Sequence, residues 1–129
     1  LLKEIIKEDF VPVIVPMGLD EKGIPYNINA DTAAGAIARS IKSRRLMLLT
    51  DIDGVLDNND KLISEINTMK AKELIDSEII HGGMIPKVKT CIDAINNGVR
   101  AVVIIDGRKP HSILFELFSD KGAGTLIRK

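Results

Sequence analysis

Short continuous apolar runs along the chain predict strands. The clearest are Arg45 to Thr50 and Ala101 to Ile105. Val11 to Val15 is a third run, punctuated by Pro12 and Pro16, and it predicts a buried strand. A short strand at 61–66 and a last one at Thr125 to Arg128 are also expected. Unbroken apolar runs are typical of parallel strands covered on both faces.

Between these runs, apolar residues recur at helical spacing. We expect helices at 1–8, Ala30 to Lys42, Thr68 to Asp76, Met84 to Asn97 and Pro110 to Phe118. Thr68 is expected to cap the third helix, and Gly98 to end the fourth. The inward positions are expected to be Ala33, Ala34, Ile37, Ala38 and Ile41 in the second helix, and Ile85, Val88, Ile92 and Ile95 in the fourth.

Strands alternating with helices predict an α/β fold, a three-layer α/β/α domain with a mostly parallel sheet. In such sheets ligands bind at the carboxyl ends of the strands. The loops after Val15, Thr50 and Ile105 are therefore the places to look for chemistry. The segment Gly18 to Pro25 is expected to be a polar, turn-rich loop.

Length and composition limit the number of domains, the kinds of partner and the cellular location that the sequence predicts. A chain of 129 residues predicts one domain. The 18 basic and 18 acidic residues balance, so charge gives no case for nucleic acid or an anionic membrane. No apolar run reaches membrane-spanning length. The single cysteine, Cys91, suits a reducing, cytoplasmic location. The start LLKEIIKE lacks Met and already has helical spacing, which suggests a piece of a longer protein.

The sharpest local motif is His81-Gly-Gly-Met-Ile-Pro-Lys87. Two glycines open a helix whose first turn tolerates Pro86, and such an end attracts anions. Lys87 and Lys89 lie in this first turn with no acid nearby in the sequence, although cations there oppose the helix dipole. Either they are solvated lysines or a phosphate completes the site. His81 and His111 lack metal-ligand spacing and are expected to be structural or exposed, so no metal site is predicted.

Two further motifs each leave alternatives open. In Tyr26-Asn-Ile-Asn-Ala-Asp31, Asn29 suits a helix N-cap and Asp31 a first-turn acid, which leaves Asn27 unexplained. Asp51-x-Asp53-Gly54 follows a strand and fits a polar turn, a nucleotide-contacting loop, or the nucleophile motif of a haloacid-dehalogenase-like phosphatase using Asp51. The phosphatase also needs a later acidic pair, and Asp106 has no second acid beside it. Gly122-Ala-Gly-Thr125 is by itself a weak glycine signal.

Together these segments resemble the amino-acid kinase superfamily, and within it the N-acetylglutamate kinases. The resemblance rests on five segments in order: Pro12 to Gly18, Tyr26 to Ala38, Leu49 to Leu56, Gly83 to Val88 and Gly122 to Ile127. It implies transfer of a phosphoryl group from ATP to the γ-carboxylate of N-acetyl-L-glutamate, a step of arginine biosynthesis. It also implies Mg²⁺ held through the ATP phosphates.

The resemblance assigns roles by position. Lys87 and Asp31 are catalytic: the lysine contacts the transferring phosphate, and the aspartate holds the active-site lysines. Asn27 matches the asparagine that binds the substrate's α-carboxylate, and Asn29 lies on the same turn. Thr50, Asp51, Gly54, Gly83, Met84 and Lys87 are expected to contact the nucleotide. Glu116 and Gly122 match positions that help bind arginine as an inhibitor.

The resemblance also predicts what residues 1–129 lack. They match the nucleotide-binding C-terminal domain, whereas the N-terminal substrate-binding half, with its own lysine and glycines, is absent. The isolated piece is therefore expected to be inactive, and the full-length enzyme to be a homo-oligomer. The alternatives are a glutamate- or aspartate-type amino-acid kinase, the phosphatase, and a non-catalytic module that senses arginine or a nucleotide.

Overall fold

A four-stranded sheet forms the centre of the protein, in a computed structural model that describes residues 1–129. Its strand order is β3 (Arg45–Thr50), β5 (Ala101–Asp106), β6 (Gly124–Arg128) and β4 (Glu65–Asn67). The β3–β5 and β4–β6 pairs are parallel, and the β5–β6 pair is antiparallel. The predicted α/β class with a mostly parallel sheet is confirmed.

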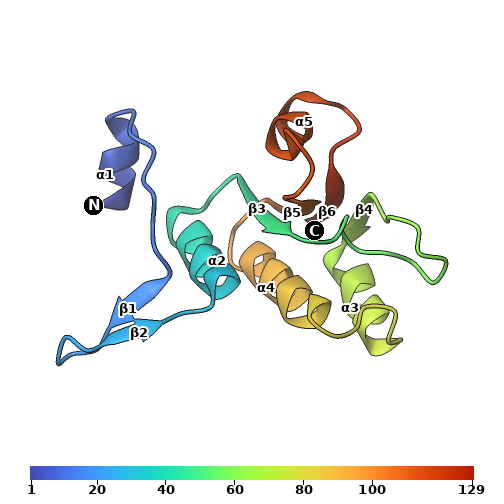
Figure 1. Ribbon diagram of the computed structural model, residues 1–129, viewed down its shortest axis with the longest axis horizontal. Helices are drawn as coiled ribbons and strands as arrows, with labels where there is room; N and C mark the ends of the chain where they lie inside the picture. The colour runs from blue at the N-terminus through green and yellow to red at the C-terminus, as the bar shows by residue number, and fades with distance from the viewer.

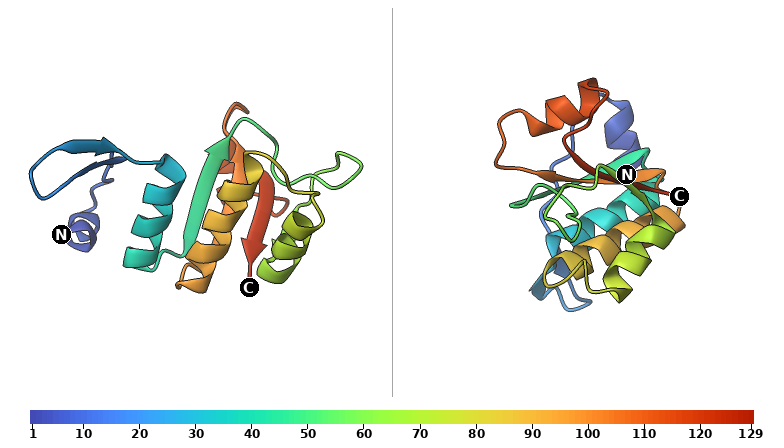
Figure 2. Two further views of the ribbon diagram at one scale, coloured as in Figure 1. Left: turned by 90° about the horizontal axis from the view of Figure 1, so that it is seen from below. Right: turned by 90° about the vertical axis from the view of Figure 1, so that its right-hand side faces the viewer.

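Helices lie on both faces of this sheet, which gives the expected three layers (Figures 1 and 2). One face is covered by α2 (Ala30–Ile41), α4 (Met84–Asn96) and α3 (Thr68–Asp76), and the other by the short α5 (Ser112–Phe118). Helix α1 (Leu2–Lys7) lies to one side, away from the sheet. No helix of the chain combines the length and apolar character needed to cross a membrane.

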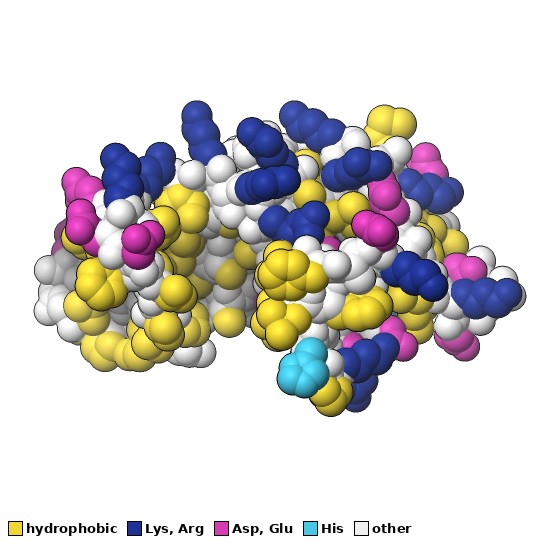
Figure 3. Space-filling model, turned by 90° about the horizontal axis from the view of Figure 1, so that it is seen from above, with side chains coloured by type: hydrophobic (Ala, Val, Ile, Leu, Met, Phe, Trp, Pro, Cys, Tyr) yellow, Lys and Arg dark blue, Asp and Glu magenta, His cyan; other side chains and the backbone are white.

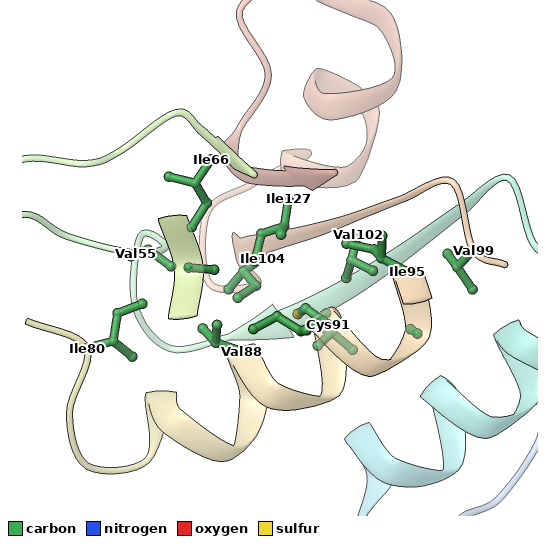
Figure 4. Close-up of a cluster of buried hydrophobic side chains, with 14 of the residues drawn as sticks. Val55, Ile66, Ile80, Val88, Cys91, Ile95, Val99, Val102, Ile104 and Ile127 are labelled. Carbon is green, nitrogen blue, oxygen red and sulfur yellow. The ribbon is translucent and has the colours of Figure 1, made fainter. Parts of the chain in front are cut away.

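The core lies between α4 and the sheet. Figure 4 shows side chains of α4 pointing toward those of β5 and β6, among them Val88, Cys91 and Ile95 opposite Ile104 and Ile127. All five are buried, as the apolar stripe of this helix predicts. The helix ends where predicted: Asn97 is its C-cap, and Gly98 follows with a φ of +105°.

The predicted strand at Val11 to Val15 is wrong. This segment forms no strand, and Val11 and Val13 are 87% and 91% exposed. Pro12 and Pro16 remove two backbone donors from it, and β3 pairs only with β5, so its outer edge does not take up the segment.

The region expected to be a polar loop after Gly18 is instead a small hairpin. Strands β1 (Met17–Leu19) and β2 (Pro25–Asn27) pair antiparallel away from the main sheet (Figure 1). The carboxylate of Asp20 accepts the backbone N–H groups of Lys22 and Ile24, which closes the turn. The turn chemistry was readable in the sequence, whereas the pairing of its flanks was not.

Local boundaries also differ from expectation. Asn67, not Thr68, caps α3, because its side chain accepts the backbone N–H of Lys70 at 2.7 Å. Only Glu65–Asn67 is a strand in the region predicted at 61–66. Helix α5 begins at Ser112 rather than Pro110, since His111 before it has a φ of +58°.

Two apolar surfaces remain uncovered. On α5, Ile113, Leu114, Phe115, Leu117 and Phe118 are all exposed. On α2, Ala38 is buried as predicted, but Ala33, Ala34, Ile37 and Ile41 are only half-buried. They line an open groove with the Pro12–Pro16 segment. Figure 3 shows apolar side chains over α5 and over the lobe that carries α1, with a hollow between them.

Candidate functional site

A cavity of about 660 Å³ opens at the carboxyl end of β3. Its lining comes from three pieces of the chain: the end of β3 and the loop after it, the turn before α4, and the first turn of α4. All six residues predicted to contact a nucleotide line this one cavity: Thr50, Asp51, Gly54, Gly83, Met84 and Lys87.

The amino end of α4 forms one wall. Gly82 takes a φ of +56°, and Gly83 is the N-cap position, where no side chain closes the helix end. The backbone N–H groups of Met84 and Ile85 donate to the carbonyls of His81 and Gly82, at 3.3 and 3.2 Å, and Pro86 has no N–H. The attraction of this helix end for an anion therefore rests on the partial positive charge of the helix dipole.

Lys87 projects from this first turn and pairs with Asp31 of α2. The lysine Nζ and the aspartate Oδ2 are 2.5 Å apart, and the two side chains are 15% and 28% exposed. Gly35 allows α2 to pack closely on α4, because a Cβ on it would lie 2.9 Å from the side chain of Thr90.

No acid lies near Lys87 in the sequence, because its partner belongs to another helix, and the contact agrees with the expectation from the resemblance that Asp31 holds an active-site lysine. Lys89 forms no ion pair and lines a different groove, between α3 and α4. The cation at the cavity is therefore Lys87, which is the only lysine or arginine in its lining.

The loop after β3 forms the opposite wall. Gly54 and Val55 are buried, and the backbone N–H of Val55 donates to the hydroxyl of Thr125 in β6 at 2.8 Å. Further along, the carboxylate of Asp57 accepts the N–H groups of Asn59 and Lys61, which hold the pKa of this carboxyl below its usual range. The loop is therefore a closed turn rather than a free segment.

Charges at the neighbouring strand end are internally matched. Asp106, at the end of β5, is buried and accepts three hydrogen bonds from the backbone and guanidinium of Arg108. These bonds lower the pKa of Asp106 to about 2. Lys109 forms an ion pair with Asp53. Asp106, the acid at the next strand end that a phosphatase would need for its metal, is thus engaged by a guanidinium.

The predicted substrate residues lie outside the cavity lining. Asn27 ends β2 on the exposed hairpin. Asn29 is the N-cap of α2, where its Oδ1 accepts the N–H of Thr32 at 3.0 Å. The helix-cap interpretation of Asn29 is confirmed, and the role of both asparagines in binding a substrate stays a prediction. Both asparagines come just before Asp31 in the chain, and Asp31 pairs with Lys87 of the cavity lining.

The predicted effector residues lie on the other side of the sheet. Glu116 and Gly122 line a polar cavity of about 250 Å³. One oxygen of the Glu116 carboxylate faces the guanidinium of Arg45 at 3.3 Å, and the other accepts the N–H of Ala123 at 2.8 Å. The carboxylate thus already binds a guanidinium, which belongs to the chain itself.

Sequence reasoning missed several residues that line the main cavity. His81 is exposed, as expected, yet it lies in the lining, and its glycine neighbours were the signal that could have included it. Ile79, Ile80 and Asp60 also contribute, although no motif marked them. Nowhere in the chain do three or more histidine, cysteine or acidic side chains gather as a metal site.

Comparison with known proteins gives one family. The sequence model of the amino acid kinase family matches residues 1–106. The acetylglutamate kinase of Pelagibacter ubique is 65% identical over 128 residues, which are 99% of this chain and 44% of that protein. The acetylglutamate kinase of Rhodospirillum centenum is 54% identical over 127 residues, 98% of this chain and 42% of that protein. The chain thus spans less than half the length of these curated relatives.

Solved structures agree in fold. An N-acetylglutamate synthase from Neisseria gonorrhoeae, complexed with coenzyme A and L-arginine, superposes with a TM-score of 0.92 at 26% identity. The match covers 99% of this chain and 30% of that one. A Giardia carbamate kinase gives a TM-score of 0.71 at 24% identity, covering 99% of this chain and 46% of that one, which shows the fold alone.

Proposed function

The chain belongs to the amino acid kinase family, and from that premise we propose that it is the ATP-binding domain of an acetylglutamate kinase. The whole enzyme would transfer the γ-phosphoryl group of ATP to the γ-carboxylate of N-acetyl-L-glutamate. The curated relatives that carry this name support the proposal. Residues 1–129 would supply the nucleotide site, and the substrate-binding half would come from sequence outside them.

The single observation that carries the proposal is the position of Lys87. It is the only lysine or arginine of the large cavity, and it stands at an uncapped helix end where an anion is stabilised. Triphosphate oxygens carry negative charge that this arrangement suits. Asp31 fixes the direction of the ammonium group through their 2.5 Å contact. We propose that Lys87 contacts the transferring phosphate and that Asp31 holds Lys87 in position.

The proposed chemistry needs no protein nucleophile. A carboxylate oxygen of the acceptor forms a bond to the γ-phosphorus as the bond to the bridging oxygen of ADP breaks, which gives an acyl phosphate. Negative charge spreads over the phosphoryl oxygens in the transition state, so catalysis consists of positioning and charge stabilisation. Lys87 supplies the positive charge on one side.

Three finer assignments belong to the same proposal. Asn27 and Asn29 would hold the acceptor, because they lead into α2 just before Asp31. Mg²⁺ would be held by the ATP phosphates, as is usual for this ion in phosphoryl transfer. Arginine would be an effector bound at Glu116 and Gly122. The internal contact of Glu116 with the guanidinium of Arg45 supports this assignment, because it is the type of contact that an arginine ligand would make.

The rival functions have weaker support. A phosphatase using Asp51 is not favoured, because the relatives are kinases and Asp106 is neutralised by Arg108. A glutamate- or aspartate-type kinase would share the nucleotide loop, but the curated relatives are named acetylglutamate kinases. A nucleotide sensor without chemistry would use the same Lys87 site, but the relatives named as kinases do not favour it.

Calorimetry with ADP and a non-hydrolysable ATP analogue tests the nucleotide site. We expect Lys87→Ala to weaken binding of the ATP analogue by about tenfold to a hundredfold, the usual worth of a charge-assisted hydrogen bond. The matched control is Lys89→Ala, which removes a cation two residues away on the same turn but outside the cavity. It should leave affinity within about twofold, since exposed charges are screened at physiological salt. Equal losses in the two variants would contradict the assignment.

A further inference from the structure

Thr125 stands where the sequence offered only a weak glycine signal. It is the second residue of β6, it is fully buried, and it lies opposite Ile104 of β5. Its neighbour Gly124 lets the two strands approach, because a Cβ there would lie 2.0 Å from the carbonyl oxygen of Ile104. The threonine hydroxyl is directed away from this ladder, toward the loop that follows β3.

This hydroxyl completes the pairing of two other residues. The N–H of Ile63 donates to the carbonyl of Val55 at 2.9 Å, as in one half of an antiparallel pair. A regular pair would return a second bond from Val55 to Ile63. The Thr125 hydroxyl takes its place, because it accepts the N–H of Val55 at 2.8 Å and donates to the carbonyl of Ile63 at 2.7 Å.

The backbone held in this way is a wall of the nucleotide cavity. Gly54, Val55, Leu56 and Asp57 all line it. Gly54 has a φ of +147°, and a Cβ on it would lie 2.6 Å from the Thr125 hydroxyl, so the threonine touches this wall directly. Glycine has the freedom to move if that contact is lost.

The loop is held at both ends by buried strands. At its start, the N–H of Gly107 donates to the carbonyl of Thr50 at 2.9 Å, which ties the end of β3 to β5. At its far end the tie is Thr125. Between them lies only the half-exposed Lys109–Asp53 ion pair, which salt weakens. Loss of the Thr125 tie would leave the Gly54–Val55 peptide held by the Ile63–Val55 hydrogen bond and by the packing of the buried Val55 side chain, so this part of the cavity wall would be less rigidly positioned.

We propose that Thr125 is a positioning residue for the nucleotide, whose hydroxyl fixes the Gly54–Val55 peptide and with it one wall of the cavity. The inference rests on the proposed function, because it takes this cavity to be the nucleotide site. Thr125 does not line the cavity, so it acts through the loop rather than by touching the ligand.

The test compares a replacement that keeps the shape of the threonine with one that keeps its hydroxyl. Thr125→Val keeps the shape but leaves the N–H of Val55 and the carbonyl of Ile63 without partners, whereas Thr125→Ser keeps the hydroxyl. We expect Thr125→Val to weaken ADP binding about tenfold, and Thr125→Ser to stay within about threefold of the parent chain. Affinities are measured by calorimetry at a temperature where circular dichroism shows each variant folded.

A control separates binding from stability. Val99 is buried just before the start of β5, at the opposite end of the strand from the cavity, so Val99→Ala lowers stability without touching the loop. It should bind ADP as the parent does. Parent-like affinity of folded Thr125→Val would overturn the inference and leave the proposed function intact. Failure of the parent chain to bind ADP or ATP would overturn the proposed function, and the inference with it.

Hydrogen exchange covers the case in which Thr125→Val does not fold. In the parent chain the amide of Val55 should exchange slowly, and more slowly still with ADP bound, because the nucleotide and the hydroxyl stabilise the same loop. Fast exchange of this amide in the folded parent would overturn the proposal without any variant.

Discussion

Replacing Asp31 by Asn removes the partner of Lys87 while keeping the size of the side chain. Breaking a fully buried ion pair costs about 3–5 kcal/mol, and an exposed pair is worth about 0–1 kcal/mol. The two side chains are 28% and 15% exposed, which places this pair between those limits. We therefore expect the Asp31→Asn variant to lose about 1–3 kcal/mol of unfolding free energy, measured by urea denaturation with the slope compared between variants.

Two comparisons isolate the pair. Asp93→Asn breaks the more exposed Arg39–Asp93 pair, which joins the same two helices, and should cost at most about 1 kcal/mol. Asp31 and Lys87 each also interact with a helix dipole, worth about 0.3–1 kcal/mol. A double-mutant cycle with Lys87→Met cancels these separate effects, and should leave a coupling of about 1–2 kcal/mol. Zero coupling, or a loss no larger than that of Asp93→Asn, would refute the argument.

Two further predictions concern acid and activity. The pKa of Asp106 is about 2 in the folded chain, below its ordinary value of 3.8, so the stability it contributes is present above that ordinary value and is lost as the pH falls toward 2. Urea titrations at several pH values should show this loss in the parent chain and a weaker pH dependence in Asp106→Asn; equal pH dependence would contradict the assignment. Residues 1–129 alone should give no acyl phosphate in a hydroxamate assay with ATP and N-acetylglutamate, because Lys87 is the only lysine or arginine in the cavity lining. If the chain alone gave acyl phosphate and Lys87→Ala abolished it, the positive charge of Lys87 on one side of the phosphoryl group would be sufficient for the reaction.

The fold was predictable wherever one element carries its own signal. The apolar run at Arg45 to Thr50 gave a strand with those bounds, and the stripe of α4 with its terminal Gly98 gave a helix to within a residue. Val11 to Val15 had the same apolar character and forms no strand. An apolar run shows that a segment can be buried, but whether a neighbouring strand edge receives it depends on the rest of the fold.

The same distinction applies to the site. The six expected nucleotide residues were assigned by the family resemblance, and they line one cavity. Of the two motifs that contain them, only the helix start from Gly83 to Lys87 suggested anion binding by its own chemistry. The Asp31–Lys87 contact could be expected only through the family resemblance, because the two residues belong to different helices. Thr125 escaped notice, because a single buried hydroxyl has no sequence pattern, and its partners at Val55 and Ile63 come from a distant loop.

The strand order β3-β5-β6-β4 has a consequence for how fast the chain folds. Strands β5 and β6 are the only neighbours in the sheet that also follow one another along the chain. Strand β3 must wait for β5, from which β4, α3 and α4 separate it in sequence, and β4 must wait for β6. Pairing strands that are distant in sequence costs chain entropy before the contacts between them contribute any stabilisation. The four strands are therefore expected to pair late and slowly. The helices can form much earlier, which leaves the β3 and β5 apolar runs exposed for most of the folding time, the period in which association with other chains competes most strongly.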